Sequence, residues 1–552
     1  MEETSGFCTR TGTYHSQWDT EHHSWSSSSV SLPNHLLSNL ASPSKPAFVD
    51  AKSDATLTFQ DLLFLSSAIA RSLMASGVAK GDVVLLVSPN FLYFPAFVLG
   101  IMATGAVFST CNFLNTRSEL REQILDSNPV LIICTNDLRS KLDGLTSNPL
   151  LLVETLLVVV SGGINRIFDE LPEVEISPSD TAALMYSSGT TGKSKAVVCS
   201  HGNMIAMSQM LRVAWSCCYG DGDNNNTTIV DLCVLPLFHM FGLSVFICGA
   251  VSSGSTVRVV VATGRYSTDG MLTAVEKHRV TRIMVVPPMI VKMVTSFYTF
   301  RKYQLGSLKE VVCSGAQLGT EHMGSFAKCF PNVRLSQLYG LTESVGPIVM
   351  CDGVKNGEIN DSVGRLGPSV TARIIDVRSG KSVAPNCQGE LCVKGPSITK
   401  GYLNNKEATS SSIDSQGWLH TGDLCYIDGK GLVYVVDRIK ELIKYKAYQV
   451  PPAELEEVLS AHPEIIDTAV LPYPNDEVGE IPMACVVKRA GSGLTEDEII
   501  CFVQNKVTPY KKIRKVVFVD FIPRSTTGKI LRRRLKEKNN IYPTHFQISS
   551  KL

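Results

Sequence analysis

Short apolar runs alternate with amphipathic stretches along most of the chain. Five mainly apolar runs are predicted to be buried strands: residues 83–87, 130–133, 156–160, 229–235 and 257–261. Apolar residues at helical spacing lie between several of them, as at residues 62–76 and 270–278. Strands that alternate with helices in this way predict an α/β fold with largely parallel sheets.

A second pattern begins after Asp437. Residues 451–454 open a predicted helix, because proline favours the first helical turn. Strands are predicted at residues 466–471 and 483–488, followed by a helix at residues 496–506. These elements make a compact α+β unit of roughly a hundred residues, the usual size of one domain. Because 552 residues exceed what one hydrophobic core supports, we expect at least two domains, divided near this point.

Charge and hydropathy exclude two broad classes of protein. The formal net charge is only +1, whereas a dedicated nucleic-acid binder usually carries a strong basic excess or stripe. The basic run at residues 532–534 is therefore expected to be the solvated face of a charged helix. The most apolar long window, residues 234–261, contains Pro236, His239 and Arg258. It is predicted to be a buried strand and helix rather than a membrane span.

Cysteine spacing and the chain ends bear on the compartment. The sixteen cysteines form no C-x-x-C pair, which disfavours zinc and a disulfide framework and favours buried or free thiols in a reducing compartment. Residues 1–30 are rich in Ser, Thr and His without an apolar stretch, so we expect neither a signal peptide nor a fixed fold there. The chain ends in Ser550-Lys551-Leu552, the C-terminal address for the peroxisome. This tripeptide predicts peroxisomal localisation and binding by the import receptor.

A loop rich in glycine, hydroxyl groups and lysine lies between apolar runs at residues 187–195. Its backbone N–H groups, hydroxyls and ammonium groups can approach polyphosphate oxygens. A P-loop needs glycine five positions before Gly192, where Ser187 stands, and it opens directly into a helix. Here residues 195–199 have the pattern of a strand. The loop is therefore predicted to bind phosphate, but not as a P-loop.

Three further polar clusters carry groups that a nucleotide needs. The stretch QLYGLTE offers the ring of Tyr339, which can stack on a base, and the carboxylate of Glu343, which can hold Mg²⁺. The stretch GWLHTGD ends in Asp423, which can accept hydrogen bonds from two ribose hydroxyls. The stretch PRSTTGK ends in Lys529, whose ammonium group can reach a phosphate oxygen. Each cluster alone also fits an ordinary turn, but together they favour one nucleotide site.

These motifs, with VDRIKELIKYK at residues 436–446, resemble those of the adenylate-forming superfamily of acyl-CoA synthetases, luciferases and peptide-synthetase adenylation domains. Within it the chain is most similar to plant 4-coumarate–CoA ligases, especially their peroxisomal ligase-like relatives. The resemblance covers about residues 32–536. It implies that a carboxylic acid reacts with ATP to give an acyl-adenylate and pyrophosphate. CoA then displaces AMP to give a thioester, and Mg²⁺ is the implied metal ion.

The resemblance also implies a domain organisation. Residues 31–436 would form a large N-terminal domain of α/β subdomains with mainly parallel sheets plus a β-rich part, which binds ATP and the acyl group. Residues 437–440 would be a hinge. Residues 441–540 would form a small mobile α+β C-terminal domain that carries the catalytic lysine. The segment 1–30 and the tail 541–552 would lie outside both domains.

Residue roles follow from the same match. Phosphate binding would fall to Ser187, Ser188, Gly189, Thr190, Thr191 and Lys195. The other ATP or AMP contacts would come from Gln337, Tyr339, Thr342, Asp423, Arg438, Lys440 and Lys444, with Glu343 as the Mg²⁺ ligand and Lys529 as the catalytic lysine. The acyl pocket would be lined by His239, which alone would be an ordinary core histidine, and by Phe241, Val245, Ala316 and Leu338. CoA would meet Arg265, Lys446 and Ala447.

Two departures from the family pattern bear on the substrate. Leu338 stands where most relatives have glycine, so its side chain should clash with a bulky planar acyl group or reshape the cavity. Ala447 stands where many relatives have glycine beside the CoA path. The pocket is mostly apolar, so we expect a fatty acid, an oxylipin precursor of jasmonate or a cinnamate-type acid. A 4-coumarate–CoA ligase proper, a luciferase-like oxidation of the adenylate and a non-catalytic paralogue are the alternatives.

Overall fold

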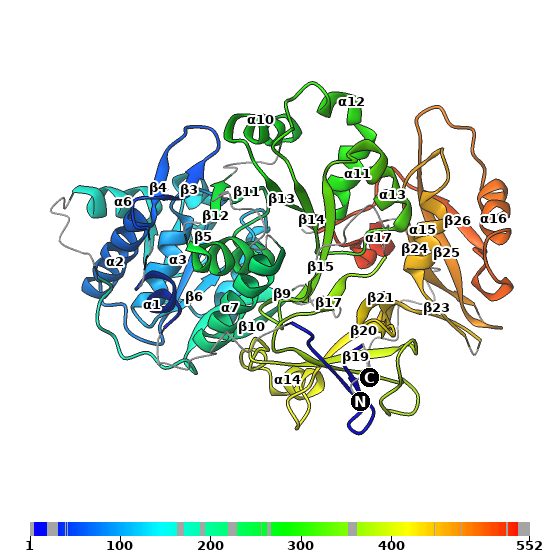
Figure 1. The fold of residues 1–552 in the computed structure, drawn as a ribbon, viewed down its shortest axis with the longest axis horizontal. Coiled ribbons are helices and arrows are strands. Elements are labelled where there is room, and N and C mark those ends of the chain that lie inside the picture. The colour runs from blue at the N-terminus through cyan, green and yellow to red at the C-terminus, as the bar shows by residue number, and fades with distance from the viewer. Residues whose placement is uncertain are drawn as a thin grey trace.

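A computed structural model describes residues 5–18, 31–38, 40, 42–162, 170–187, 194–218, 229–254, 257–261, 267–350, 361–446, 448–475, 477–525 and 528–538. Figure 1 shows a large unit, coloured blue to yellow, beside a smaller unit in orange and red. The predicted fold class, a large α/β domain with a small α+β domain after it, is confirmed by this arrangement.

The largest sheet of the described chain has a parallel half and an antiparallel half that meet at β15 (Arg334–Leu341). Its parallel half continues through β14 (Glu310–Cys313), β13 (Arg282–Val285), β11 (Ile229–Cys233), β12 (Val257–Val261) and β3 (Pro46–Asp50), with β4 (Thr56–Thr58) antiparallel at the edge. Its antiparallel half contains β16 (Gly346–Met350), β17 (Gly364–Leu366), β21 (Leu432–Arg438), β20 (Leu419–Ile427), β19 (Gly389–Lys394), β18 (Thr371–Ile375), β2 (Thr13–His15) and β1 (Phe7–Cys8). Ligands of open α/β sheets bind beyond the carboxyl ends of the strands. The residues after β15 stand in that position.

A second sheet is parallel over most of its width. Its order is β10 (Lys195–Ser200), β9 (Thr181–Ser187), β6 (Val107–Thr110), β5 (Val83–Val87), β7 (Leu131–Cys134) and β8 (Leu150–Leu152), and only the β9–β10 pair is antiparallel. Helix α3 (Phe94–Ala103) is buried along its whole length, as its almost uniformly apolar sequence requires. Helix α2 (Phe59–Ala75) begins at a capping box formed by Thr58 and Asp61.

The large unit also contains other helices among its described residues. They are α1 (Leu32–Leu37), α4 (Arg117–Ser127), α5 (Arg139–Leu142), α7 (His201–Cys218), α10 (Thr268–His278), α11 (Pro287–Thr295), α12 (Phe297–Phe300), α13 (Thr320–Cys329) and α14 (Lys406–Ser412).

Four of the five predicted strands are present, but residues 156–160 are not a strand. They lie in helix α6 (Val153–Gly162). Leu156 and Val160, four positions apart, are buried, whereas Val158 and Val159 are 71% and 58% exposed. Residues four positions apart lie on the same face of a helix, so one face of this segment packs against the protein and the other faces solvent. An uninterrupted apolar run hid this periodicity.

The N-terminal segment needs a correction within its described part. Residues 1–30 were expected to lack a fixed fold, yet residues 5–18 contain β1 and β2. Strand β2 pairs with β18, with His15 opposite Thr371 and Tyr14 opposite Ala372. The Tyr14 side chain is fully buried against Phe7, with 4.7 Å between ring centroids. Strands of two and three residues depend on a distant partner, which local sequence does not reveal.

The apolar window at residues 234–261 folds as expected. It contains α8 (Met240–Gly242), the π-helical segment η2 (Leu243–Gly249), α9 (Ala250–Ser252) and the buried strand β12. Within the described part of the chain, no helix combines the length and the apolar character that a membrane crossing requires. The thirteen cysteines whose side chains the structure describes are all free and mostly buried, as the spacing predicted.

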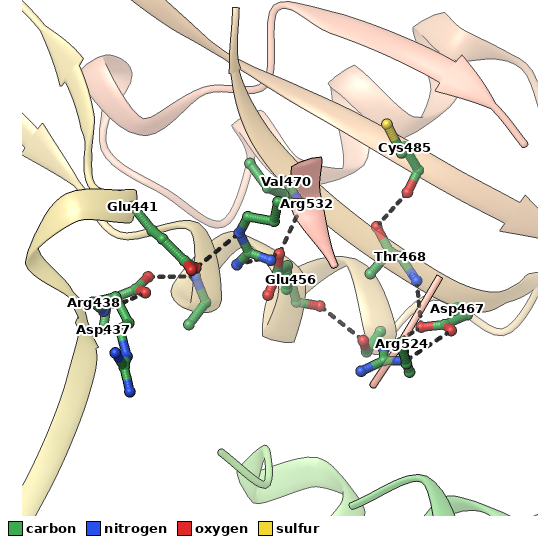
Figure 2. Close-up of polar contacts among 12 residues, drawn as sticks. Asp437, Arg438, Glu441, Glu456, Asp467, Thr468, Val470, Cys485, Arg524 and Arg532 are labelled. Atoms are coloured by element: carbon green, nitrogen blue, oxygen red, sulfur yellow. Dashed lines mark hydrogen bonds and ion pairs between the residues drawn. The ribbon is translucent and has the colours of Figure 1, made fainter. Parts of the chain in front are cut away.

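The small unit has its own sheet and core. It contains β22 (Ile443–Tyr445), β23 (Tyr448–Val450), β24 (Ile465–Asn475), β25 (Gly479–Lys488), β26 (Lys515–Phe518), α15 (Pro452–Ser460), α16 (Glu496–Gln504) and α17 (Arg532–Lys538). The short 3₁₀ turn η4 (Ile439–Glu441) connects it to β21 of the large unit. The basic run 532–534 is helical, but its Arg532 side chain is only 13% exposed and pairs with Glu441 and Glu456 (Figure 2). The expected solvated face is therefore wrong for Arg532.

Candidate active site

A cavity of about 300 Å³ lies where the two units meet. Segments far apart in the sequence contribute its walls, including the β9–β10 pair, the residues after β15, the end of β21 and the loop before α17. It is lined by nine residues that the sequence had singled out: Ser187, Lys195, His239, Phe241, Thr342, Glu343, Arg438, Lys440 and Lys529. The structure therefore brings the motif clusters to one place.

The β9–β10 hairpin sets the position of Lys195. Ser187 and Lys195 are directly opposite each other in the register of the two strands, and both line the cavity. The predicted phosphate residues Ser188, Gly189, Thr190 and Thr191 lie between them in the sequence, outside the described residues.

Tyr402 links Lys195 to Glu343. Its hydroxyl donates a hydrogen bond to Glu343 Oε1 over 2.8 Å, and Lys195 Nζ lies 5.2 Å from the centroid of its ring. Burial, followed by the charge of Glu343, raises the pKa of Tyr402, so the phenol stays protonated and donates. Sequence analysis missed Tyr402, because a single tyrosine 59 residues from its partner carries no motif.

A second buried group surrounds Asp423. The Tyr339 hydroxyl donates to Asp423 Oδ2 over 2.7 Å, and Arg438 Nε lies 2.8 Å from Asp423 Oδ1. Asp423 and Arg438 face each other across β20 and β21, so the sheet register sets the pair. Burial raises the pKa of Asp423, and the Arg438 guanidinium opposes that rise. Both carboxylate oxygens already have protein partners, so a ribose would have to exchange with one of them.

Glu390 and His420 support the turn before Asp423, and both line the cavity. Glu390 Oε2 lies 2.9 Å from His420 Nδ1, while Glu390 Oε1 accepts a hydrogen bond from the Gly422 N–H over 3.1 Å. Sequence analysis gave neither residue a role, although His420 lies in a motif that it had quoted.

Lys529 reaches the cavity from the small unit. Its side chain keeps an accessible surface because it faces the open cavity. The surrounding protein removes enough water that desolvation lowers its pKa, and the nearby Arg438 guanidinium lowers the pKa further. Asp423 and Glu343 act in the opposite direction. The ammonium group thus stands among charges of both signs contributed by the large unit.

His239 also lines the cavity. Its Nδ1 accepts a hydrogen bond from the Phe241 N–H over 3.2 Å at the start of α8. Burial, and then the charge of Lys529, lower the pKa of His239 to about 4. The imidazole is therefore neutral at pH 7, and with Nδ1 accepting, its proton resides on Nε2. Met240, Phe241 and Pro347 add apolar surface beside it.

Other predicted residues are not among those that line this cavity in the described part of the chain. The Gln337 amide donates to the Ser362 carbonyl oxygen over 3.1 Å, and Val245 is fully buried in η2. The Leu338 carbonyl accepts from Ser314, and Ser314 is the residue that lines the wall. Tyr339 and Asp423 are likewise not among the lining residues. Ala316, Lys444 and Lys446 also lie off the cavity, the last with a left-handed φ of 51°. Arg265, Ala447, Ser550, Lys551 and Leu552 are outside the described residues.

Comparisons with known proteins agree with this geometry. The family described as AMP-binding enzyme matches residues 38–403, and the AMP-binding enzyme C-terminal domain matches residues 454–529. A 4-coumarate–CoA ligase-like protein of Oryza sativa subsp. japonica is 46% identical, over 96% of this chain and 97% of its own. Peroxisomal OPC-8:0-CoA ligase 1 of Arabidopsis thaliana is 42% identical, over 96% and 97%. The ATP-bound structure of MatB from Rhodopseudomonas palustris is 25% identical, over 92% of this chain and 98% of its own, with a TM-score of 0.81.

Proposed function

The chain belongs to the AMP-binding enzyme family of adenylate-forming CoA ligases, and on that premise we propose a reaction path and residue roles for it. The carboxylate of an acid attacks the α-phosphorus of ATP, and pyrophosphate leaves. The thiol of CoA then attacks the acyl carbon of the adenylate, and AMP leaves. The observation that carries the assignment is the shared cavity, which Lys195 and Glu343 line from the large unit and Lys529 lines from the small one.

The first step builds negative charge on the phosphates. Preorganised donors and cations aimed at such charge contribute most when water is excluded. We assign this role to Lys195, Thr342 and Lys529, which line the cavity, and to Ser188, Gly189, Thr190 and Thr191, which lie outside the described residues. The position of Lys529 supports the choice, because its side chain lines the same cavity as Lys195 and Thr342.

Glu343 fits the binding of Mg²⁺. Among the described residues, only its Oε1 accepts a side-chain hydrogen bond, from Tyr402, so Oε2 can face a cation. One carboxylate together with substrate phosphates is the usual protein setting for Mg²⁺. When bound, the ion would supply charge stabilisation to the leaving pyrophosphate.

Asp423, Arg438 and Tyr339 are assigned to the nucleoside side of ATP, with Gln337 and Lys444 as more distant contributors and Lys440 at the hinge. The second step needs CoA to reach the adenylate, and we assign its path to the side of His239, Arg265, Lys446 and Ala447. Rotation of the small unit about residues 437–440 would then remove Lys529 between the two steps. The single short turn η4 between the units supports a hinge there.

We expect the substrate to be an apolar acid and the protein to be located in the peroxisome. Met240, Phe241, Leu341 and Pro347 provide apolar wall beside His239, which supports a fatty acid, an oxylipin precursor or a cinnamate-type acid. The relative named for OPC-8:0 supports including that acid. The terminal Ser550-Lys551-Leu552 and the same relative's name support a peroxisomal location and capture by the import receptor.

An acid panel tests the proposal. Purified protein is given ATP, Mg²⁺ and, one at a time, fatty acids of graded length, OPC-8:0 and cinnamates, and CoA is added in a parallel set of reactions. Acid-dependent exchange between pyrophosphate and ATP reports the first step, and the mass of the CoA thioester reports the second. We expect both signals with at least one acid. Neither signal with any acid would favour a non-catalytic paralogue, and exchange without thioester, with oxygen consumed, would favour oxidation of the adenylate.

A further inference from the structure

Lys529 stands on a turn that closes mainly on itself. The Ser525 N–H donates to the Lys529 carbonyl oxygen over 2.8 Å, and the Lys529 N–H donates to Ser525 Oγ over 3.1 Å. A single isolated bridge joins Arg524 to Ile530 at its base. These bonds fix the shape of the turn, but they do not fix its direction relative to the sheet of the small unit.

The side chain of Arg524 supplies that connection. Arg524 Nη2 lies 2.7 Å from Asp467 Oδ1, and its Nε donates to Asp467 Oδ2 over 3.3 Å (Figure 2). Its Nη1 donates to the carbonyl oxygen of Gly528 over 3.0 Å. One planar guanidinium therefore joins strand β24 to the residue directly before Lys529, a geometry that the fork of arginine allows and a lysine does not.

Both ends of this link are anchored. Asp467 Oδ1 accepts from the Thr468 N–H, and Thr468 Oγ1 donates to the Cys485 carbonyl oxygen on the neighbouring strand β25. At the other end, Gly528 has φ +80°, and a Cβ there would lie only 2.8 Å from Pro288 Cδ of α11 in the large unit. The carbonyl that Arg524 holds therefore belongs to the residue that packs directly on the large unit.

We propose that Arg524 is a positioning residue for Lys529 and that Asp467 orients Arg524. The Arg524 and Asp467 side chains are 28% and 33% exposed, and ion pairs that water reaches contribute little to stability. The Arg524–Asp467 pair therefore contributes more to the orientation of Lys529 than to the stability of the fold. Direction matters, because a reacting group misplaced by about 1 Å can slow a reaction by about 100-fold. The effect on rate rests on the proposed function, whereas the effect on the placement of Lys529 does not.

The test compares Arg524→Gln, Arg524→Lys and Asp467→Asn with Arg489→Gln. Arg489 is a matched control, because it also donates to a backbone carbonyl in the small unit, that of Pro463, which is far along the chain from the Lys529 turn. Three quantities are measured: acid-dependent pyrophosphate exchange, transfer to CoA from preformed acyl-adenylate, and the protection that ATP gives Lys529 against an amine-labelling reagent, read by mass spectrometry.

We expect Arg524→Gln to slow exchange by about 10- to 100-fold with little change in KM for ATP, and to leave transfer from preformed adenylate and the melting temperature as in Arg489→Gln. Arg524→Lys recovers part of the rate, and Asp467→Asn loses less. ATP protection of Lys529 shrinks in Arg524→Gln. The proposal is overturned if Arg524→Gln matches the control in exchange and in protection, or if both half-reactions and the melting temperature fall together. If the wild-type protein shows no pyrophosphate exchange with any acid, the proposed function is wrong. The protection of Lys529 by ATP still tests the positioning role of Arg524 in that case.

Discussion

Two lysines reach the same cavity on supports of different kinds. Lys195 begins strand β10, which pairs along its whole length with β9 inside a six-stranded sheet. Lys529 stands on a turn with one isolated bridge and a half-exposed ion pair behind it. The first support cannot move without disturbing a sheet, whereas the second can leave as part of the small unit.

Contacts that hold the small unit against the large one are correspondingly local. In the described structure they include the Thr320 N–H donating to Glu457 Oε1 over 3.0 Å, and the Ala453 N–H donating to Asp437 Oδ2 over 2.8 Å. An exposed pair between Arg534 and Glu119 adds a third contact. Such contacts can break and reform on the timescale of a domain rotation. We call the site residues of the large unit the wall, and the turn of the small unit that carries Lys529 the arm. We expect substitutions in the wall to reduce stability and binding, and substitutions in the arm to slow one chemical step.

Lys529→Ala should give the largest effect on the arm. Removing one charge-stabilising group costs about 2.7–4 kcal/mol of transition-state stabilisation, or about 100- to 1,000-fold in the adenylation rate. Pyrophosphate exchange measures this loss. Transfer from preformed acyl-adenylate should be spared, and Lys506→Ala, at an exposed lysine over Phe502 in the same unit, should change neither step. Equal loss of both steps would contradict the role given to Lys529.

Asp423→Ala should give the largest effect on the wall. It leaves the Arg438 guanidinium and the Tyr339 hydroxyl without their partner. Breaking a buried pair costs about 3–5 kcal/mol, and because Arg438 is 30% exposed we expect about 3 kcal/mol of lost stability. The urea midpoint measures it. Lys529→Ala is the contrasting variant, and a similar drop in its midpoint would erase the difference between wall and arm.

The sequence singled out nine of the residues that line the cavity, because each motif is a short continuous stretch of the chain. Glu343 and Lys529 were found from short stretches whose groups only a nucleotide would need together. Tyr402 was missed because its partner Glu343 is brought to it by the sheet and by no local pattern. The failure at residues 156–160 has the same origin, since an apolar run does not tell which of its residues face the core.

Tyr402→Phe tests a weaker part of the wall. It removes the hydroxyl that orients Glu343 and keeps the ring beside Lys195. A hydrogen bond to a charged group contributes about 1.5–3 kcal/mol, so we expect about a tenfold slower adenylation and a higher Mg²⁺ requirement. The exchange rate is measured against Mg²⁺ concentration. Tyr426→Phe, at a tyrosine stacked on Tyr434, is the control. An unchanged Mg²⁺ requirement in Tyr402→Phe would separate Glu343 from the metal.

The smallest expected effect concerns Asp437, which lies at the junction of wall and arm. Its Oδ1 accepts from the Arg438 N–H over 2.7 Å and its Oδ2 from Ala453 at the start of α15 (Figure 2 shows its place beside Arg438 and Glu441). Burial raises the pKa of Asp437 to about 7, against an ordinary value near 3.9. The folded protein therefore binds this proton more tightly than the unfolded chain, so protonation adds stability as the pH falls through 7, and that stability is absent well above it.

Asp437→Asn removes this titration and retains a neutral acceptor. Relative to Asp437→Asn, the wild type should gain about 1.4 kcal/mol between about pH 8 and about pH 6, since a single proton is bound with a pKa near 7 in the folded state. Urea midpoints of the two proteins across that range give the difference, and other titrating groups cancel in it. Asp520→Asn, at an exposed carboxyl of the small unit, should follow the wild type. A difference that stays flat would mean that Asp437 is ionised in the folded protein throughout this range. An ionised Asp437 carboxylate would then accept the hydrogen bond from the start of α15 at every pH in this range, and the strength of that contact would not change with pH.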